Sequence, residues 1–205
     1  KMSPNYNLLG LFPVPVIRIE FKDHYKYNFP EVQRKDNRPE GWKVSLHTSF
    51  PGIGDDDPIV SPLVRDSLKN DLIDSIAEVF LQLRIPTNIE IDQLWYNIYH
   101  EHQGQEPHRH LPMVGGTIPY WSGIYYNKNA SPTKFIRDDN LYGTQLFPEY
   151  DKSELAYPLS SDYSPNVKDG DILLFPPYLR HSIRSLSHHR DQMRMTFSFN
   201  MGINL

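Results

Sequence analysis

The sequence contains no cysteine among its 205 residues. Disulfide bonds and thiolate metal sites are therefore excluded, and any metal ion must be held by His, Asp or Glu side chains. No run of residues approaches the roughly 18 apolar residues of a membrane span. The start of the chain also lacks the charged, apolar and small-residue sections of a signal peptide. We expect a soluble, cytoplasmic protein with no membrane partner.

An excess of positive charge is also missing, since the formal net charge is -4 and the isoelectric point is near 6.1. Nucleic acids and anionic membranes both favour a positive protein surface, so we expect neither as a partner. A small molecule or another protein is the better expectation. The length and the 39% hydrophobic content fit one domain, covering residues 1–205, with one sizeable core.

Glycine is scarce, with 11 residues, whereas there are 18 Pro, 13 Tyr and 10 Phe. This composition favours many short β-strands with stiff connections, and a long helical bundle would not tolerate so much proline. Runs rich in β-branched and aromatic residues predict the strands, the first of them at a sheet edge. The expected strands are Leu8–Glu20, Trp42–Leu46, Ile89–His100, Trp121–Asn127, Asp171–Phe175 and Met193–Met201.

One segment, residues 61–83, has a helical pattern instead, with apolar residues at steps of three and four. Ser61 and Pro62 suit the N-cap and the first turn. The expected apolar face, which should pack on the outside of a sheet, consists of Leu68, Leu72, Ile76, Val79, Phe80 and Leu83. A single helix among many short strands predicts a β-barrel or jelly roll. The long stretch 128–168 is either a lid or an irregular surface insertion.

Two histidines, His108 and His110, are separated by one residue, so in an extended chain their imidazoles point to the same face. One metal ion could therefore bind both. His181, just beyond the strand that begins at Asp171, is a candidate third ligand if the fold brings separate strands together. Such a pair alone is a weak signal among nine histidines, and His100, His102, His188 and His189 are expected to be structural or solvated.

The last strand alternates strictly from Arg194 to Asn200, with polar residues on one face and apolar residues on the other. On a half-exposed strand the polar face would meet water, whereas inside a barrel it would meet a polar ligand. The periodicity does not choose between these alternatives. Inside an apolar barrel, Arg194 would bind a carboxylate through paired charge-assisted hydrogen bonds, to which Thr196 could add another.

The order of these motifs resembles the iron(II)/2-oxoglutarate dioxygenase superfamily: H-x-H, then G-D-I-L-L-F-P-P, L-R-H and R-x-T. The sequence is most similar to a bacterial and phage family of 2-oxoglutarate oxygenases, through an L-F-P-x-P-V start, W-x-N, S-G-x-Y-Y and a closing S-F-N. This resemblance implies a double-stranded β-helix, a mainly β jelly roll (cupin-like) with one supporting helix. If the chain is encoded by a phage, its location would be the host cytoplasm.

The resemblance also implies the functional residues. Iron(II) ligands would be His108, His110 and His181, and a clamp for the co-substrate 2-oxoglutarate would be formed by Arg194 and Thr196. The run from Ile124 to Lys128 is similar to a prolyl-hydroxylase strand whose second tyrosine contacts 2-oxoglutarate, which selects Tyr126. Asn97 is a further candidate for contacting the co-substrate. The implied reaction uses O₂ to hydroxylate a protein side chain or a small metabolite and releases succinate and CO₂.

One position departs from the superfamily, which usually has a carboxylate where this chain has His110. The two-histidine, one-carboxylate triad is therefore not formed by this motif. Glu106, on the same strand face, is the alternative third ligand. Two other functions remain open: a non-enzymatic cupin-like barrel that binds a ligand, and a three-histidine metal enzyme that does not use 2-oxoglutarate.

Overall fold

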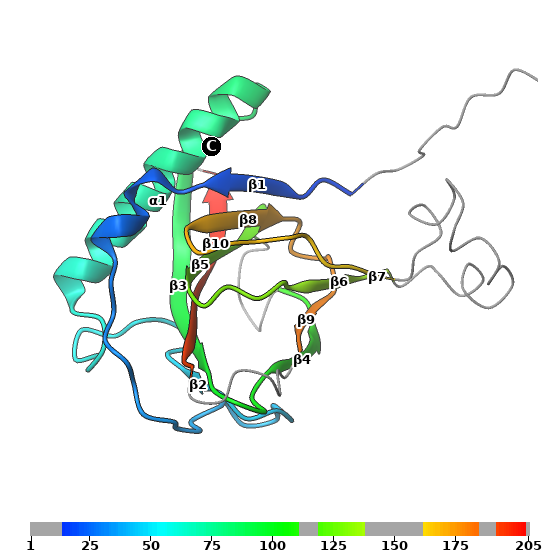
Figure 1. Cartoon of the computed structure of the whole chain (residues 1–205). Helices are drawn as coiled ribbons and strands as arrows, with labels where there is room; N and C mark the ends of the chain where they lie inside the picture. The colour runs from blue at the N-terminus through cyan, green and yellow to red at the C-terminus, as the bar shows by residue number, and fades with distance from the viewer. Residues whose placement is uncertain (1–13, 111–118, 138–161, 185–191, 204–205) are drawn as a thin grey trace, which may run out of the picture.

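Two antiparallel β-sheets and one long α-helix form the protein (Figure 1). The structure is a computed structural model and describes residues 14–110, 119–137, 162–184 and 192–203. This mainly β arrangement confirms the expected double-stranded β-helix with one supporting helix. Among the described residues, no helix has the length and apolar character that crossing a membrane requires.

The larger sheet has six strands in the order β1-β8-β5-β10-β3-β2. Its two longest strands, β3 and β10, are neighbours and pair along most of their length. The N-terminal strand lies at one edge, as the sequence predicts, but it begins only at Ile17: residues 14–16 are irregular, and residues 8–13 lie outside the described part of the chain. The bounds are β1 Ile17–Glu20, β2 His47–Thr48, β3 Ile89–Tyr99, β5 Trp121–Lys128, β8 Asp171–Phe175 and β10 Arg194–Ile203.

The smaller sheet has four short strands in the order β4-β9-β6-β7 and lies opposite the larger one (Figure 1). Its bounds are β4 Gln105–His108, β6 Lys134–Ile136, β7 Asp162–Tyr163 and β9 His181–Ile183. Strands β6 and β7 belong to the stretch 128–168, so the described ends of that stretch complete the barrel wall. The choice between a lid and an insertion concerns residues 138–161, which lie outside the described residues.

Helix α1 (Pro62–Leu83) packs on the outer face of the larger sheet, as Figure 1 shows. Ser61 caps it by accepting a hydrogen bond from the Val64 backbone N–H, and Pro62 occupies the first turn, both as predicted. Four of the six predicted apolar positions are fully buried and Val79 is partly buried. Leu83 is 52% exposed, so its inclusion in the buried face was wrong. The 3-10 helix η1 (Lys22–Lys26) precedes this region.

Both faces of β10 are buried, which decides the alternative that periodicity left open. The apolar face, including Phe197 and Phe199, packs in the core that contains α1. The polar face lies inside the barrel, where Arg194, Thr196 and Ser198 are only 2–7% exposed. Side chains alternate across a strand, so one sequence pattern supplies the core on one side and a polar interior on the other.

The predicted strand Trp42–Leu46 was wrong, because this segment is irregular and the strand begins at His47. Its backbone groups bond to loops rather than to a β-ladder: Trp42 N–H donates to the Pro39 carbonyl, and the Leu46 carbonyl accepts from Asn37. Trp42 and Leu46 instead pack in a small apolar cluster with Tyr99. In this segment Leu46 is buried, Trp42, Val44 and Ser45 are partly buried and Lys43 is exposed, so the alternating sequence arises here without strand pairing.

Candidate metal and co-substrate site

Three predicted ligands, His108, His110 and His181, lie together in the barrel although 71 residues of sequence separate the pair from the third. Each offers one ligand atom, and these atoms all lie within 4.8 Å of one another. His108 is the last residue of β4 and pairs with His181, the first residue of β9. His110 follows β4, and its backbone N–H donates to the Pro177 carbonyl in the β8–β9 connection. Pairing of two short strands thus assembles the cluster.

Hydrogen bonds fix which ring nitrogen of each histidine is available. The Nδ1 atoms of His108 and His181 lie 2.9 Å from the backbone carbonyls of Glu106 and Leu179. A carbonyl only accepts, so each Nδ1 carries the proton and each Nε2 keeps a free lone pair. His110 Nδ1 makes the equivalent bond, 2.8 Å long, to Asn200 Oδ1. Histidines that bind metals usually make such an outer hydrogen bond.

The surroundings keep all three rings neutral near pH 7. Burial, followed by the proximity of His108, lowers the pKa of His110 to about 4 and that of His181 well below its ordinary value. Burial also lowers the pKa of His108. Neutral imidazole is the form that binds a metal ion, so the site is prepared for a cation without first losing protons.

Glu106, the alternative third ligand, is engaged elsewhere. Its Oε1 accepts a hydrogen bond from the Lys43 backbone N–H at 3.0 Å. Burial acts to raise its pKa and is the largest single effect, but backbone hydrogen bonds from residues 43, 106 and 44 and the nearby His108 together outweigh it and lower the pKa. The group of described residues able to hold a metal together consists of the three histidines and does not include Glu106.

Arg194, at the start of β10, extends its guanidinium into the barrel and is 5% exposed. Its Nη2 donates to the Ser131 carbonyl at 2.8 Å, whereas Nε and Nη1 are buried and have no hydrogen-bond partner among the described residues. The guanidinium lies 5.2 Å from the ring centroid of Tyr99 and 6.0 Å from that of Tyr126. A buried cation with two free donors between aromatic walls fits a carboxylate well.

The other predicted co-substrate residues form one row across the sheet. Thr196 pairs with Asn97 on one side and with Tyr126 on the other, and all three are buried. The Tyr126 hydroxyl lies 2.6 Å from the Thr133 hydroxyl. Asn97 donates to Ser198 at 3.1 Å and accepts from Thr48 at 2.8 Å, so its amide is partly occupied by the protein itself.

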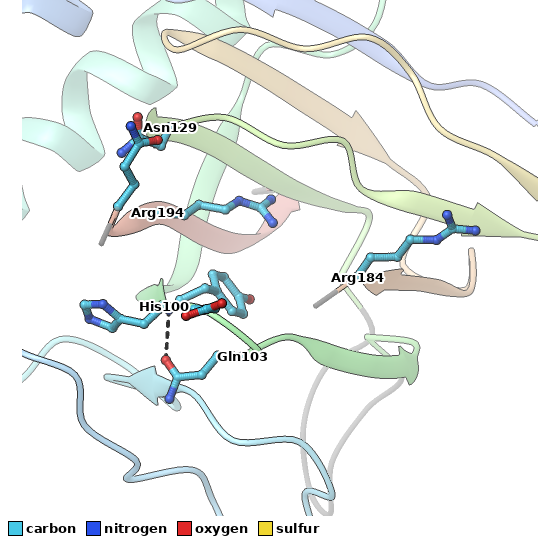
Figure 2. Close-up of a pocket in the computed structure, with 8 residues that line it drawn as sticks. His100, Gln103, Asn129, Arg184 and Arg194 are labelled. Carbon is cyan, nitrogen blue, oxygen red and sulfur yellow. Dashed lines mark hydrogen bonds between the residues drawn. The ribbon is translucent and has the colours of Figure 1, made fainter. Parts of the chain in front are cut away.

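A small pocket adjoins Arg194 (Figure 2). Its lining is mostly polar: Tyr99, His100, Glu101, Gln103, Asn129, Arg184, Gln192 and Arg194. In Figure 2, Arg194 lies between Asn129 on one side and His100 and Gln103 on the other. His100 and the exposed His102 do not belong to the metal cluster found among the described residues, as expected of structural or surface groups. His188 and His189 lie outside the described residues.

Three residues that sequence reasoning did not assign border the same interior. Tyr99 stacks beside Arg194, and Trp95 places its ring 5.6 Å from that of His110. The Trp95 indole nitrogen is buried without a hydrogen-bond partner among the described residues. Asn200 bonds to His110. Period-two alternation was the available signal, since Trp95, Asn97 and Tyr99 share one face of β3, as Arg194 and Asn200 share the polar face of β10.

Comparison with known proteins identifies the family. A family model described as "Putative 2OG-Fe(II) oxygenase" matches residues 93–200, just over half of the chain. The protein therefore belongs to this 2OG-Fe(II) oxygenase family. That match begins in β3 and ends in β10, and so includes all three histidines and Arg194. No curated protein matches the sequence.

Several solved structures have similar folds. HygX from Streptomyces hygroscopicus, with nickel and 2-oxoglutarate bound, has a TM-score of 0.52 at 13% identity, over 94% of this chain and 84% of that one. The epimerase SnoN from nogalamycin biosynthesis has a TM-score of 0.52 at 10% identity, over 93% and 78%.

A 2OG-Fe(II) oxygenase family protein from Burkholderia pseudomallei has a TM-score of 0.50 at 10% identity; the match covers 78% of this chain and 66% of that one. At these identities the likeness concerns the fold. The family implies iron(II) and 2-oxoglutarate, and the residues present fit both groups: three available imidazole nitrogens for a metal, and an unpaired guanidinium for a carboxylate.

Proposed function

We propose that the protein is an iron(II)- and 2-oxoglutarate-dependent dioxygenase that hydroxylates a protein side chain or a small metabolite and releases succinate and CO₂. The observation that carries the proposal is the presence, on the inner surface of one barrel, of three neutral imidazoles and a buried guanidinium whose Nε and Nη1 have no hydrogen-bond partner among the described residues. Each buried donor left unpaired costs about 1–3 kcal/mol, which a bound carboxylate would recover.

In this proposal His108, His110 and His181 hold iron(II) through their Nε2 atoms. Their Nδ1–H groups already donate to Glu106 O, Asn200 Oδ1 and Leu179 O, respectively. Committing the outer nitrogen orients each ring and fixes its tautomer before the metal arrives. Three histidines leave the remaining metal positions for exogenous ligands, as an oxygenase needs.

Arg194 binds the distal carboxylate of 2-oxoglutarate in this proposal, using Nε or Nη1, which have no partner among the described residues. Thr196 and Tyr126, adjacent on the same inner surface, add hydroxyl groups, and Asn97 adds an amide whose bonds to Thr48 and Ser198 hold it in place. The Tyr99 and Tyr126 rings exclude water from the guanidinium, which strengthens its attraction for an anion.

When bound, iron and 2-oxoglutarate together supply the oxidative chemistry. The protein contributes orientation of the two groups and a water-poor interior. The candidate substrate comes from the sequence. The similarity of the Tyr125–Tyr126 strand to prolyl hydroxylases makes a prolyl side chain the first candidate, ahead of a small metabolite.

The test is succinate formation from 2-oxoglutarate in the presence of iron(II) and O₂, measured with and without candidate peptides or metabolites. We expect slow turnover without a primary substrate, loss of turnover in His181→Ala, and acceleration by the true substrate. The Arg65→Lys variant, changed on α1 outside the barrel, is a matched control and should behave as wild type. Absence of iron-dependent succinate formation and of 2-oxoglutarate binding would refute the proposal.

The lack of a carboxylate in the metal cluster favours one second candidate, a three-histidine metal enzyme that does not use 2-oxoglutarate. In that case Arg194 would bind the carboxylate of the substrate itself. Iron binding that persists while 2-oxoglutarate fails to bind would select this candidate. A cupin-like binding protein would show ligand binding without iron-dependent turnover.

A further inference from the structure

Asn200 occupies the centre of a hydrogen-bond network beside the metal cluster. Its Oδ1 accepts from His110 Nδ1 at 2.8 Å and from the Ser122 hydroxyl at 2.8 Å. Its Nδ2 donates to Gln93 Oε1 at 2.9 Å. The bond to Gln93 fixes the amide so that the oxygen faces His110. These groups come from β3, β5 and β10, three adjacent strands of the larger sheet.

His110 needs this contact more than the other two histidines do. His108 and His181 each bond to the carbonyl of the residue two positions earlier, which their own local backbone provides. The hydrogen-bond partner of the His110 Nδ1 atom is instead a side chain, 90 residues away in sequence. His110 also stands outside β4, so no ladder fixes its orientation.

We propose that Asn200 is a positioning residue for His110, which holds the imidazole in the Nδ1–H form with Nε2 directed at the metal. The inference rests on the proposed function, because it takes His110 to be a metal ligand. An aspartate ligand at position 110 would not need such a partner, because a carboxylate has no tautomers. The three-histidine site therefore depends on an acceptor from β10.

The physical argument concerns the proton. A neutral imidazole carries its hydrogen on one nitrogen, and the acceptor at Nδ1 decides which. Without an acceptor, a buried Nδ1–H would be unsatisfied, and the form protonated on Nε2, which has no lone pair for a metal, would be favoured. Loss of outer partners of this kind typically costs 10- to 100-fold in metal affinity.

The experiment reads the tautomer directly. Two-bond ¹H–¹⁵N correlation spectra of metal-free, histidine-labelled protein distinguish the Nδ1–H and Nε2–H forms, and a His110→Gln spectrum assigns the His110 signals. Wild type should show Nδ1–H. Asn200→Leu, which keeps the size but removes the acceptor, should shift His110 to Nε2–H and weaken iron(II) or zinc binding by about 10- to 100-fold. Asn200→Asp, which restores an acceptor, should recover the Nδ1–H form.

Ser122→Ala is the matched control, since it removes the second bond to the same Asn200 oxygen while leaving His110 its acceptor. It should keep the tautomer and nearly all of the metal affinity. An unchanged His110 tautomer in Asn200→Leu would overturn the proposal, as would a tautomer that Asn200→Asp fails to restore. If instead His110→Gln itself binds metal with wild-type affinity, the ligand assignment under the proposed function fails, whatever the tautomer result.

Discussion

His108 and His181 face each other across the β4–β9 ladder, with ring centroids 4.2 Å apart. Both are end residues of short strands in the smaller sheet. A cross-strand pair brings side chains close without requiring a loop to adopt one conformation. The residue pair at one end of this ladder thus supplies two of the three proposed metal ligands. Apolar residues elsewhere stabilise the barrel.

Replacing either His108 or His181 by Ala should abolish iron(II) binding with little loss of fold. The rings stand at strand ends, and the main apolar core does not include them. We expect the melting temperature of the metal-free protein to fall by less than about 4 °C, equivalent to roughly 1 kcal/mol. Calorimetric titration with iron(II) under anaerobic conditions measures the binding. His102→Ala, on an exposed turn, is the control, and full affinity in either site variant would refute the assignment.

Replacing His110 by Asp should create the usual two-histidine, one-carboxylate set and tighten iron(II) binding, because the ligand gains a negative charge. Uncoupled 2-oxoglutarate turnover should be retained or increased. Succinate formation and metal titration measure the two effects. An aspartate variant that lost iron would show that residue 110 does not occupy the carboxylate position, and Glu106 would then be the better candidate.

Arg194→Lys should weaken 2-oxoglutarate binding by about tenfold to a hundredfold, since charge-assisted hydrogen bonds contribute roughly 1.5–3 kcal/mol each. Lysine keeps the charge but loses the planar pair of donors. Iron affinity should hardly change, because Arg194 is not a ligand. The absorbance of the iron–2-oxoglutarate chelate measures the titration, with Arg65→Lys as control. Equal affinities for wild type and Arg194→Lys would exclude the clamp.

Trp95 should report metal binding by fluorescence. Its ring lies 5.6 Å from His110, whereas Trp121 packs against Phe80 on the outer face of the sheet. Cobalt(II) binding should therefore quench a component of the emission that is absent in Trp95→Phe and present in Trp121→Phe. Quenching that survives in Trp95→Phe would place the bound ion elsewhere.

The metal-free protein should lose stability on acidification below about pH 6.5. Burial holds the folded-state pKa of His110 at about 4, below the ordinary value of about 6.5, so the unfolded chain binds more protons between these values. The free energy of unfolding then falls by up to about 1.4 kcal/mol per pH unit for such a group as pH decreases through this window. His110→Asn should have a shallower slope in denaturant unfolding measured from pH 7 to pH 4. An unchanged slope would contradict the neutral, buried state of this ring.

The sequence by itself determined the helix and most strands of the larger sheet. Capping by Ser61 and Pro62 and the spacing of Leu68, Leu72 and Ile76 are local signals, so they are readable without the fold. The alternation from Arg194 to Asn200 likewise predicted two different faces. The strand predicted for Trp42–Leu46 was wrong because an alternating sequence also occurs in a segment that pairs with no strand.

Tertiary structure alone decided what those faces meet. Periodicity is the same for a strand in water and for one lining a barrel, so only burial on both sides of β10 placed Arg194 in a dry interior. Strands β4, β6, β7 and β9 have two to four residues, too few to form a periodic signal. Pairing of β4 with β9 brings His181 to His108. The position of Asn200 beside His110 likewise depends on segments that are far apart in the sequence, and such contacts cannot be read from any local stretch.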